Sequence, residues 1–186
     1  MKKFISVLLA LVMVFSLTAC GGNNNAETEA PTEEPTAAPT DAPAVEQNGT
    51  LDELLNQVVT EQPVEFMGGV IPVDVTDTTE DGLANLKYFT GLETADGITE
   101  AAVYEPMMGS IAFSMVMVRV DEGMDALTVA EAMKAGIDPR KWICVEAEEV
   151  MVAGSGDVVM LIMCSGAQSF VDAFQTVRGA ELDFVI

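Results

Sequence analysis

Residues 152–179 read VAGSGDVVMLIMCSGAQSFVDAFQTVRG. Within this segment an apolar run, Val158–Cys164, follows a glycine-containing turn at 154–157. A short run that is apolar at every position is typical of a central strand, either buried on both sides or covered on its outer side by another helix. The next segment, Ala167–Arg178, has apolar residues at helical spacing and is followed by a glycine, which is typical of a helix end. With residues 142–152 as the partner strand, the sequence predicts a β-hairpin followed by a helix.

The same pattern occurs once earlier in the chain. Residues 100–105 and 111–120 are predicted strands around a turn at 107–110, and residues 125–135 are a predicted helix. Two hairpin-helix units predict an α+β fold, with an antiparallel sheet of about four strands and the helices packed on one face. Two explanations of the repeated hairpin-helix pattern stay open: a true duplication, or a common way of building such domains.

Two additional N-terminal helices are predicted before these units. Thr50 and Glu53 form a capping box, in which each side chain bonds the other residue's backbone N–H. Apolar residues then follow at helical spacing to about residue 60. A second helix is predicted over residues 79–90. The segment 64–75 between them holds two adjacent glycines and a proline and is compatible with an edge strand.

The first twenty residues predict export and lipidation. Lys2 and Lys3 precede 14 uncharged residues, which suits a secretory signal of about 7–15 apolar residues rather than a membrane span of about 20. The sequence Leu-Thr-Ala-Cys that ends at Cys20 resembles the bacterial lipobox, in which the cysteine thiol is acylated before cleavage on its N-terminal side. We therefore expect a signal peptide over residues 1–19 and lipid attachment at Cys20. The alternative is ordinary cleavage near Ala19, which leaves Cys20 as a free thiol.

Residues 20–49 predict a disordered tether. The segment after Cys20 contains prolines at every fourth position, six acids, no base and no aromatic residue. Such a composition cannot bury enough apolar surface to fold. Residues 50–186 then form a single domain. Because stable anchoring takes two acyl chains, a diacylated Cys20 would hold this domain at the outer face of the cell membrane.

Charge and composition exclude several classes of function. Without Lys2 and Lys3 the chain has 6 bases against 30 acids, a net charge of −24. Nucleic-acid binding depends on basic contacts to phosphates, so we expect no nucleic-acid partner. The chain has no histidine, which removes the commonest general base and excludes Ser-His-Asp and Cys-His nucleophiles. We expect neither an enzyme nor a cofactor.

An aspartate-rich segment is the first candidate metal site. Asp77-x-Thr79-x-Asp81-Gly82 is similar to the opening of a calcium loop. Such a loop needs a bidentate carboxylate at its twelfth position, and this position is Tyr88. We interpret the segment as an acidic helix N-terminus, where carboxylates interact well with the helix dipole.

The second candidate metal site is a set of thioethers, which can bind Cu(I). The methionines on the two hairpins are Met107, Met108, Met115, Met117, Met151, Met160 and Met163. Methionine is also an adaptable core residue, and no polar residues cluster around these positions. We therefore predict that no metal is bound.

The two cysteines beyond Cys20 are Cys144 and Cys164. Export permits a disulfide. A turn around Ser155, however, places Cys164 opposite Ala147, about three residues out of register, which is too far for a bridge. The sequence therefore favours two buried thiols.

The remaining candidates lie in the predicted strand 142–152 and just before it. Arg140, Lys141 and Trp142 are a possible partner contact, because arginine and tryptophan are enriched at binding hot spots. The predicted strand places Trp142 on its more polar face, which supports this interpretation. The alternative is a strand start whose bases relieve local acidity beside a core tryptophan. Glu146, Glu148 and Glu149 could form an acid–base pair as in glycosidases, but a solvated strand face explains them better.

The segment 91–177 resembles a family of small lipoproteins of Gram-positive anaerobes that is defined only as a domain of unknown function. The resembling features are Leu86-Lys87-Tyr88 before Gly91-Leu92, Ala102-Val103-Tyr104-Glu105, Ile137-Asp138-Pro139-Arg140-Lys141-Trp142, and the run 158–163 after Gly154-Ser155-Gly156. The resemblance implies a stable domain without known enzyme chemistry, and it transfers no functional residue.

Three functions follow from these observations as hypotheses. The first is a non-enzymatic, membrane-anchored extracytoplasmic lipoprotein that binds a protein or a cell-wall component. The second is a module that senses a small molecule or a metal ion. The third is a carboxylate-dependent hydrolase that acts on wall material.

Overall fold

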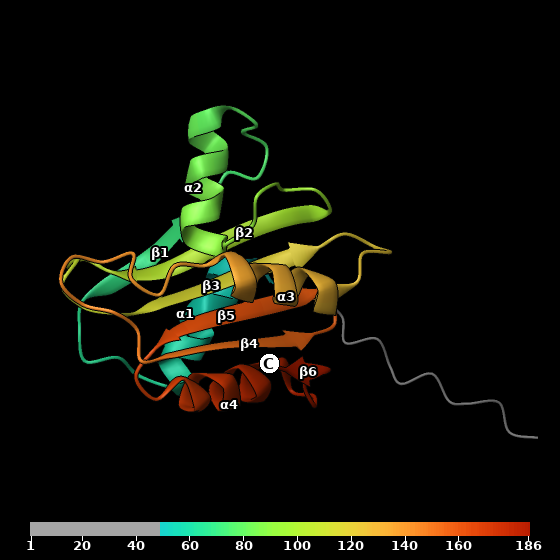
Figure 1. Ribbon diagram of the computed structural model, residues 1–186. Helices are drawn as coiled ribbons and strands as arrows, with labels where there is room; N and C mark the ends of the chain where they lie inside the picture. Colours follow the sequence, from blue (N-terminus) through green and yellow to red (C-terminus); the bar gives the residue numbers. More distant parts are fainter. Residues whose placement is uncertain (1–48) are drawn as a thin grey trace, which may run out of the picture. The chain divides into compact units, whose positions relative to one another are not determined.

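A computed structural model describes residues 49–186, and the strands of this part form one antiparallel sheet (Figure 1). The strands are β1 Gly68–Pro72, β2 Ile98–Pro106, β3 Ser114–Val120, β4 Glu149–Ser155, β5 Val158–Cys164 and β6 Phe184–Val185. The helices are α1 Leu51–Glu61, α2 Glu80–Thr90, α3 Ala126–Gly136 and α4 Ala167–Arg178. The strand order is β1-β2-β3-β5-β4-β6. Cys20 and the leader lie outside the described residues.

The α+β class and both hairpin-helix units are confirmed, since β2-β3-α3 and β4-β5-α4 follow one another as expected. The prediction of about four strands is wrong, because β1 adds to the outer side of β2 and β6 to the outer side of β4. The edge strand considered for residues 64–75 is confirmed as β1, whereas β6 has no apolar run that would identify it.

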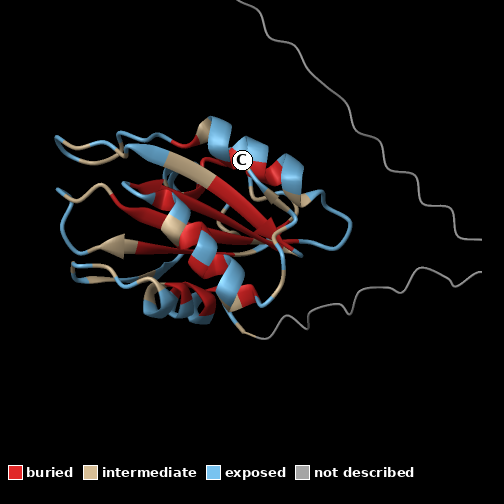
Figure 2. Cartoon of the chain, turned by 90° about the horizontal axis from the view of Figure 1, so that it is seen from below, coloured by how far each residue is buried: buried red, intermediate tan, exposed pale blue. Residues whose placement is uncertain are grey.

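The prediction that the helices pack on one face is also wrong, because helices cover both faces of the sheet. Every residue of β5 is buried, with Met160 and Ile162 in one core cluster and Val159 and Leu161 in the other. Helices α1 and α4 cover the first face, and α2 and α3 cover the second. A central strand that is apolar on both sides requires this arrangement, because either face left open would expose apolar surface to water. Figure 2 shows the buried strands between helices whose outer sides are exposed.

The helices at residues 51–61 and 80–90 are therefore not additions to a four-stranded core. Each of them is half of a helical layer: α1 packs beside α4, and α2 packs beside α3. Their starts follow from local capping. Thr50 and Glu53 form the capping box of α1, and the Thr79 side chain accepts from Gly82 N at the start of α2.

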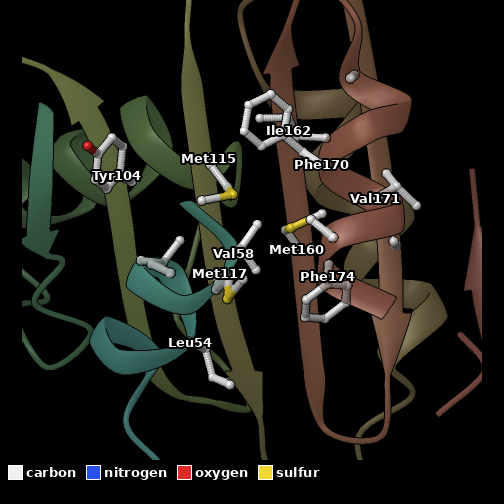
Figure 3. Close-up of a cluster of buried hydrophobic side chains, with 14 of the residues drawn as sticks. Leu54, Val58, Tyr104, Met115, Met117, Met160, Ile162, Phe170, Val171 and Phe174 are labelled. Atoms are coloured by element: carbon white, nitrogen blue, oxygen red, sulfur yellow. The ribbon is translucent and has the colours of Figure 1, made fainter. Parts of the chain in front are cut away.

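The core of the first face combines thioethers with aromatic rings (Figure 3). Met115, Met117 and Met160 are fully buried there, against Phe170 and Phe174 of α4 and residues of α1. Methionine fills irregular space between two helices and a sheet because its side chain is flexible. The methionines of the central strands are thus core residues.

The two units differ in the face that their helices cover. Because β3 and β5 are antiparallel neighbours, a rotation about an axis perpendicular to the sheet superimposes one hairpin on the other. The same rotation leaves α3 and α4 on opposite faces. The geometry therefore favours a repeated pattern over a duplication that conserved the arrangement of the unit.

The prediction of a strand over residues 142–152 is wrong in its first half. Strand β4 begins at Glu149, which lies opposite Cys164, and residues 137–148 form a loop. Cys144 in this loop has a φ of 65°, a left-handed conformation that a strand cannot contain. Cys144 is exposed and Cys164 is buried, and both are free thiols. The prediction of two buried thiols is therefore correct for Cys164 alone.

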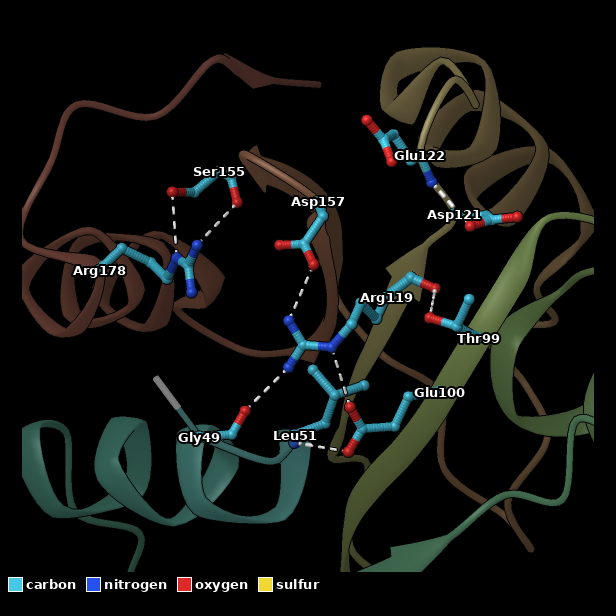
Figure 4. Close-up of polar contacts among 10 residues, drawn as sticks. All are labelled: Gly49, Leu51, Thr99, Glu100, Arg119, Asp121, Glu122, Ser155, Asp157 and Arg178. Carbon is cyan, nitrogen blue, oxygen red and sulfur yellow. Dashed lines mark hydrogen bonds and ion pairs between the residues drawn. The ribbon is translucent and has the colours of Figure 1, made fainter. Parts of the chain in front are cut away.

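The entry of the chain into the domain is held by Arg119 of β3 (Figure 4). Its guanidinium bonds Glu100 Oε2 at 3.0 Å, Asp157 Oδ2 at 2.9 Å and the carbonyl oxygen of Gly49 at 2.9 Å. Glu100 also accepts from Leu51 N at 2.8 Å. These bonds tie the start of α1 to β2, to β3 and to the turn between β4 and β5. Among residues 49–186 no helix is both long and apolar enough to cross a membrane.

Candidate partner-binding surface

The loop 137–148 is fixed to the sheet by Lys141. The side chain of Lys141 is 2% exposed, and its Nζ lies 2.7 Å from Glu105 Oε1 and 3.0 Å from Ser114 Oγ. The ammonium also lies 4.8 Å from the ring centre of Tyr88 and 5.2 Å from that of Phe89. Burial lowers the pKa of Lys141, while the Glu105 carboxylate acts in the opposite direction. Lys141 is therefore an internal ion, enclosed by a carboxylate and aromatic faces, and cannot reach a partner.

The other two predicted contact residues differ in exposure. Trp142 packs against the core of the second face, and its Nε1 is buried without a hydrogen-bond partner in the described part of the chain. Arg140 is exposed and its Nε donates to Glu146 Oε2 at 2.5 Å. A shallow hollow of about 390 Å³ lies between Arg140, Trp142 and Cys144. Of the three residues predicted as a partner contact, only Arg140 is exposed, and Lys141 and Trp142 are partly or largely buried.

The next residue in the loop, Ile143, is 77% exposed. Its backbone N–H donates to Gly109 O at 3.4 Å, so the loop touches the turn between β2 and β3. That turn carries Met107 and Met108, which are 75% and 60% exposed. Met107 N in turn donates to the carbonyl oxygen of Met67 at 2.9 Å, and Met67 is 78% exposed.

We call these four side chains, Met67, Met107, Met108 and Ile143, the methionine patch. Three separate segments bring them together, and none of the four belongs to either core cluster. Backbone hydrogen bonds join the three segments, so four exposed apolar residues lie on neighbouring segments; exposed apolar groups of this kind can mark interaction sites, and methionine adapts its shape to partners. The domain as a whole is strongly acidic, because residues 49–186 hold 6 bases and 24 acids, a net charge of −18.

The sequence did not predict this patch, because all methionines of the two hairpins were interpreted together as core residues. A signal was present in the turn itself. Turns favour Gly, Pro, Asn, Asp and Ser, whereas Pro106 here is followed by two methionines before Gly109. Met107 and Met108 lie at the tip of the hairpin, away from the buried faces of the sheet, and this distinguishes them from the buried methionines of β3 and β5.

The three carboxylates proposed as an acid–base pair have structural partners. Glu146 pairs with Arg140, Glu148 accepts from Ser165 Oγ at 2.8 Å, and Glu149 accepts from Ala167 N at 2.7 Å. The last of these caps α4, whose N-cap position is a glycine without a side chain.

The aspartates of the candidate calcium segment are also engaged. Asp77 accepts from Thr79 N at 3.0 Å and from Thr79 Oγ1 at 2.6 Å, and the hydroxyl hydrogen bond lowers the pKa of Asp77. Within residues 49–186 no group of three or more Cys, Asp or Glu side chains is placed to hold a metal ion. The segment is a capped helix start, as α2 requires.

A groove of about 440 Å³ lies between α3 and the segment that follows α2. Leu92, Ile98 and Val129 are among its apolar lining residues, and Glu93 and Asp96 supply carboxylates. The glycines at its inner end allow a close approach of backbones, because a Cβ at Gly136 would overlap the carbonyl oxygen of Gly91. The groove is within the size range of small-molecule sites, about 300–1,000 Å³.

Comparisons with known proteins return no similar sequence or fold: no family model, no curated protein and no solved structure matches this chain.

Proposed function

We propose that this chain is a lipid-anchored extracytoplasmic binding module, which captures a protein of the cell envelope through the methionine patch. The anchor is the acylated Cys20 predicted from the lipobox, and the resemblance to small lipoproteins of unknown function agrees with it. The observation that carries the binding function is the group of four exposed apolar side chains on a strongly acidic domain. Burial of such side chains against a partner stabilises the complex by about 25 cal/mol per Å² of apolar surface that is removed from water.

The position of the anchor is tested separately from binding. Mass spectrometry of the native protein should find residue 20 as the acylated first residue. Cys20→Ala should release the protein from the membrane fraction. An unmodified Cys20, or a chain that keeps its leader, contradicts the proposed location.

Site-specific photo-crosslinking in intact cells tests the patch. A photoreactive residue at Met108 should give one discrete adduct, and the same residue at Gln175 of α4, which is exposed but outside the patch, should give none. Ile143→Asp should abolish the adduct, because a carboxylate in the patch must be desolvated on binding. Leu127→Asp is the matched control, since Leu127 is 37% exposed on α3. Adducts that form equally at both positions, or that survive Ile143→Asp, contradict the proposal.

A second candidate function is supported by the groove beside α3. Its apolar lining and the Asp96 carboxylate suit a small molecule with an apolar body and a positive charge, whereas Glu93 already pairs with Lys87 Nζ at 2.6 Å. Ala132→Leu would fill the groove from an exposed position of α3. A panel of aliphatic amines should raise the melting temperature of the native protein but not of this variant. Equal shifts in both proteins argue against the groove as the site. The hydrolase hypothesis gains no comparable support, because its three carboxylates bind structural partners.

A further inference from the structure

Strand β1 is the free edge of the sheet next to the methionine patch. Met67 of the patch directly precedes β1, and β1 pairs with β2 on one side only. Figure 1 shows β1 at the border of the sheet opposite to β4 and β6. Edge strands expose unpaired backbone groups, and natural proteins protect them with lysines, prolines, bulges or covering segments.

The register identifies the backbone groups that point outward. Met107 N donates to Met67 O, and Val73 N donates to Ala101 O, so odd-numbered residues of β1 bond to β2. In an antiparallel pair the intervening residues turn their N–H and C=O away from the partner strand. The free edge therefore presents both groups of Gly68 and Val70 and the carbonyl of Pro72. Within the described residues the amides of Gly68 and Val70 have no hydrogen-bond partner.

The side chains of β1 leave room for a neighbour. Met67, Gly69 and Ile71 lie on the same side of the strand because side chains alternate. Ile71 is 44% exposed, and a Cβ at Gly69 would meet nothing within 4 Å. Two exposed apolar side chains thus flank an open notch. The strand contains no lysine, and Pro72 loses no ladder bond because its nitrogen faces outward.

The charge around β1 defines the chemistry of the partner. From Gly49 to Leu86 the chain has eight acids and no base. Glu61 and Glu65 precede β1 and Asp74 and Asp77 follow it, and all four are exposed or nearly so at the two ends of the strand. A neighbouring segment with basic side chains would therefore find opposite charge at both ends of the edge.

We propose that the partner of this module adds an extended, basic segment to β1 as a further strand, with an apolar side chain over Gly69 between Met67 and Ile71. This mode of recognition obtains affinity from backbone hydrogen bonds and specificity from alternate side chains. The proposal rests on the proposed binding function and names its mode. Charge disfavours the two other occupants: a second copy carries a net charge of −18 on the same residues, and the linker has six acids and no base.

The test uses the mature chain with Cys20→Ala, which keeps it in solution, and a short peptide of alternating lysine and valine. In ¹H–¹⁵N spectra the peptide should shift the amides of Gly68 and Val70 saturably and slow their hydrogen exchange. A peptide of alternating glutamate and valine should bind at least about tenfold more weakly, since several exposed charge pairs change sign. Methylation of alternate peptide amides should abolish binding. Shifts that are absent, or that occur away from β1, overturn the proposal.

Two pairs of variants distinguish a loss of strand addition at β1 from a loss of folding. Val70→Pro removes the outward N–H without removing a ladder bond, which edge strands tolerate, and should abolish peptide binding; Val70→Thr keeps the N–H and should bind. Ile71→Lys should weaken binding and Ile71→Glu should retain it. Circular dichroism checks that each variant is folded. If Val70→Pro binds as Val70→Thr does, strand addition at β1 is wrong.

The outcomes also distinguish the two proposals. A dimer in sedimentation that Val70→Pro dissociates would show that a second copy occupies the edge, which overturns the basic-partner proposal. If the adduct at Met108 in cells persists in Val70→Pro, the patch binds its partner by another mode and only the strand addition fails. If the peptide binds β1 but a photoreactive residue at Met108 gives no adduct in cells, β1 can accept a further strand, and the proposed function of the patch is wrong.

Discussion

Replacing Lys141 with methionine tests how the loop 137–148, which carries Ile143 of the methionine patch, is held in place. Lys141→Met keeps most of the aliphatic stem and its packing against Tyr88 and Phe89 but removes the ammonium. Glu105, whose side chain is 12% exposed, then has no cation within reach. Its carboxylate would be left largely buried without the ammonium that it pairs with.

The expected cost follows from this burial. Removing one partner of a buried ion pair costs about 3–5 kcal/mol, and the lower end applies because Glu105 keeps some contact with water. A domain of this size loses about 2–4 °C in melting temperature per kcal/mol, so Lys141→Met should melt roughly 10 °C lower. The lowered pKa of Lys141 shows that burial of the ammonium is itself costly. The double variant Lys141→Met with Glu105→Gln should therefore regain most of the loss, because it removes the uncompensated charge.

Urea denaturation of the mature chain measures these differences. Arg140→Met is the matched control, because Arg140 is the adjacent base and pairs with Glu146 at a site where both side chains are more than half exposed. Exposed pairs contribute about 0–1 kcal/mol. If Lys141→Met destabilises the protein no more than Arg140→Met, or if Glu105→Gln fails to rescue it, Lys141 does not hold the loop.

Three further predictions follow from the same structure. Arg119→Lys should lower the free energy of unfolding by about 2 kcal/mol, since lysine cannot bond Glu100, Asp157 and the Gly49 carbonyl together; an unchanged urea midpoint would contradict this role. Iodoacetamide at pH 8 should alkylate Cys144 and spare Cys164, because Cys164 is buried and burial raises the pKa of its thiol to about 12; mass spectrometry of the intact chain reads the result. Gly136→Ala should cost about 1–3 kcal/mol through overlap with the Gly91 carbonyl, and a melting temperature equal to that of the parent would show that the backbones separate easily.

The hairpin-helix units were predictable because their signals are local. Apolar runs, turn glycines and helix ends lie within the segments that they define, and Ala167–Arg178 and Val158–Cys164 have the predicted bounds. Strand β6 had no such signal. Its two residues are ordered by pairing with Ala153 and Gly154, and this pairing depends on contacts between distant parts of the chain. The ring of Phe184 occupies the space where a side chain at position 154 would lie. The sequence indicates Gly154 only as part of a turn, but the pairing of β4 with β6, the last strand of the chain, requires a glycine there.

The loop 137–148 shows why residues at a surface are harder to predict than elements. The alternation that suggested a strand is present in the sequence, but Lys141 is drawn inward by Glu105 on a strand 36 residues earlier, and Cys144 adopts a left-handed conformation. Both features reverse the expected directions: the base is buried, and Ile143 turns outward. The exposure of Ile143 therefore depends on the ion pair between the neighbouring Lys141 and Glu105, which the sequence alone does not indicate. The same dependence means that loss of Lys141 should disturb the methionine patch as well as stability, so a photoreactive residue at Met108 in Lys141→Met should lose its adduct, whereas in Arg140→Met it should keep it.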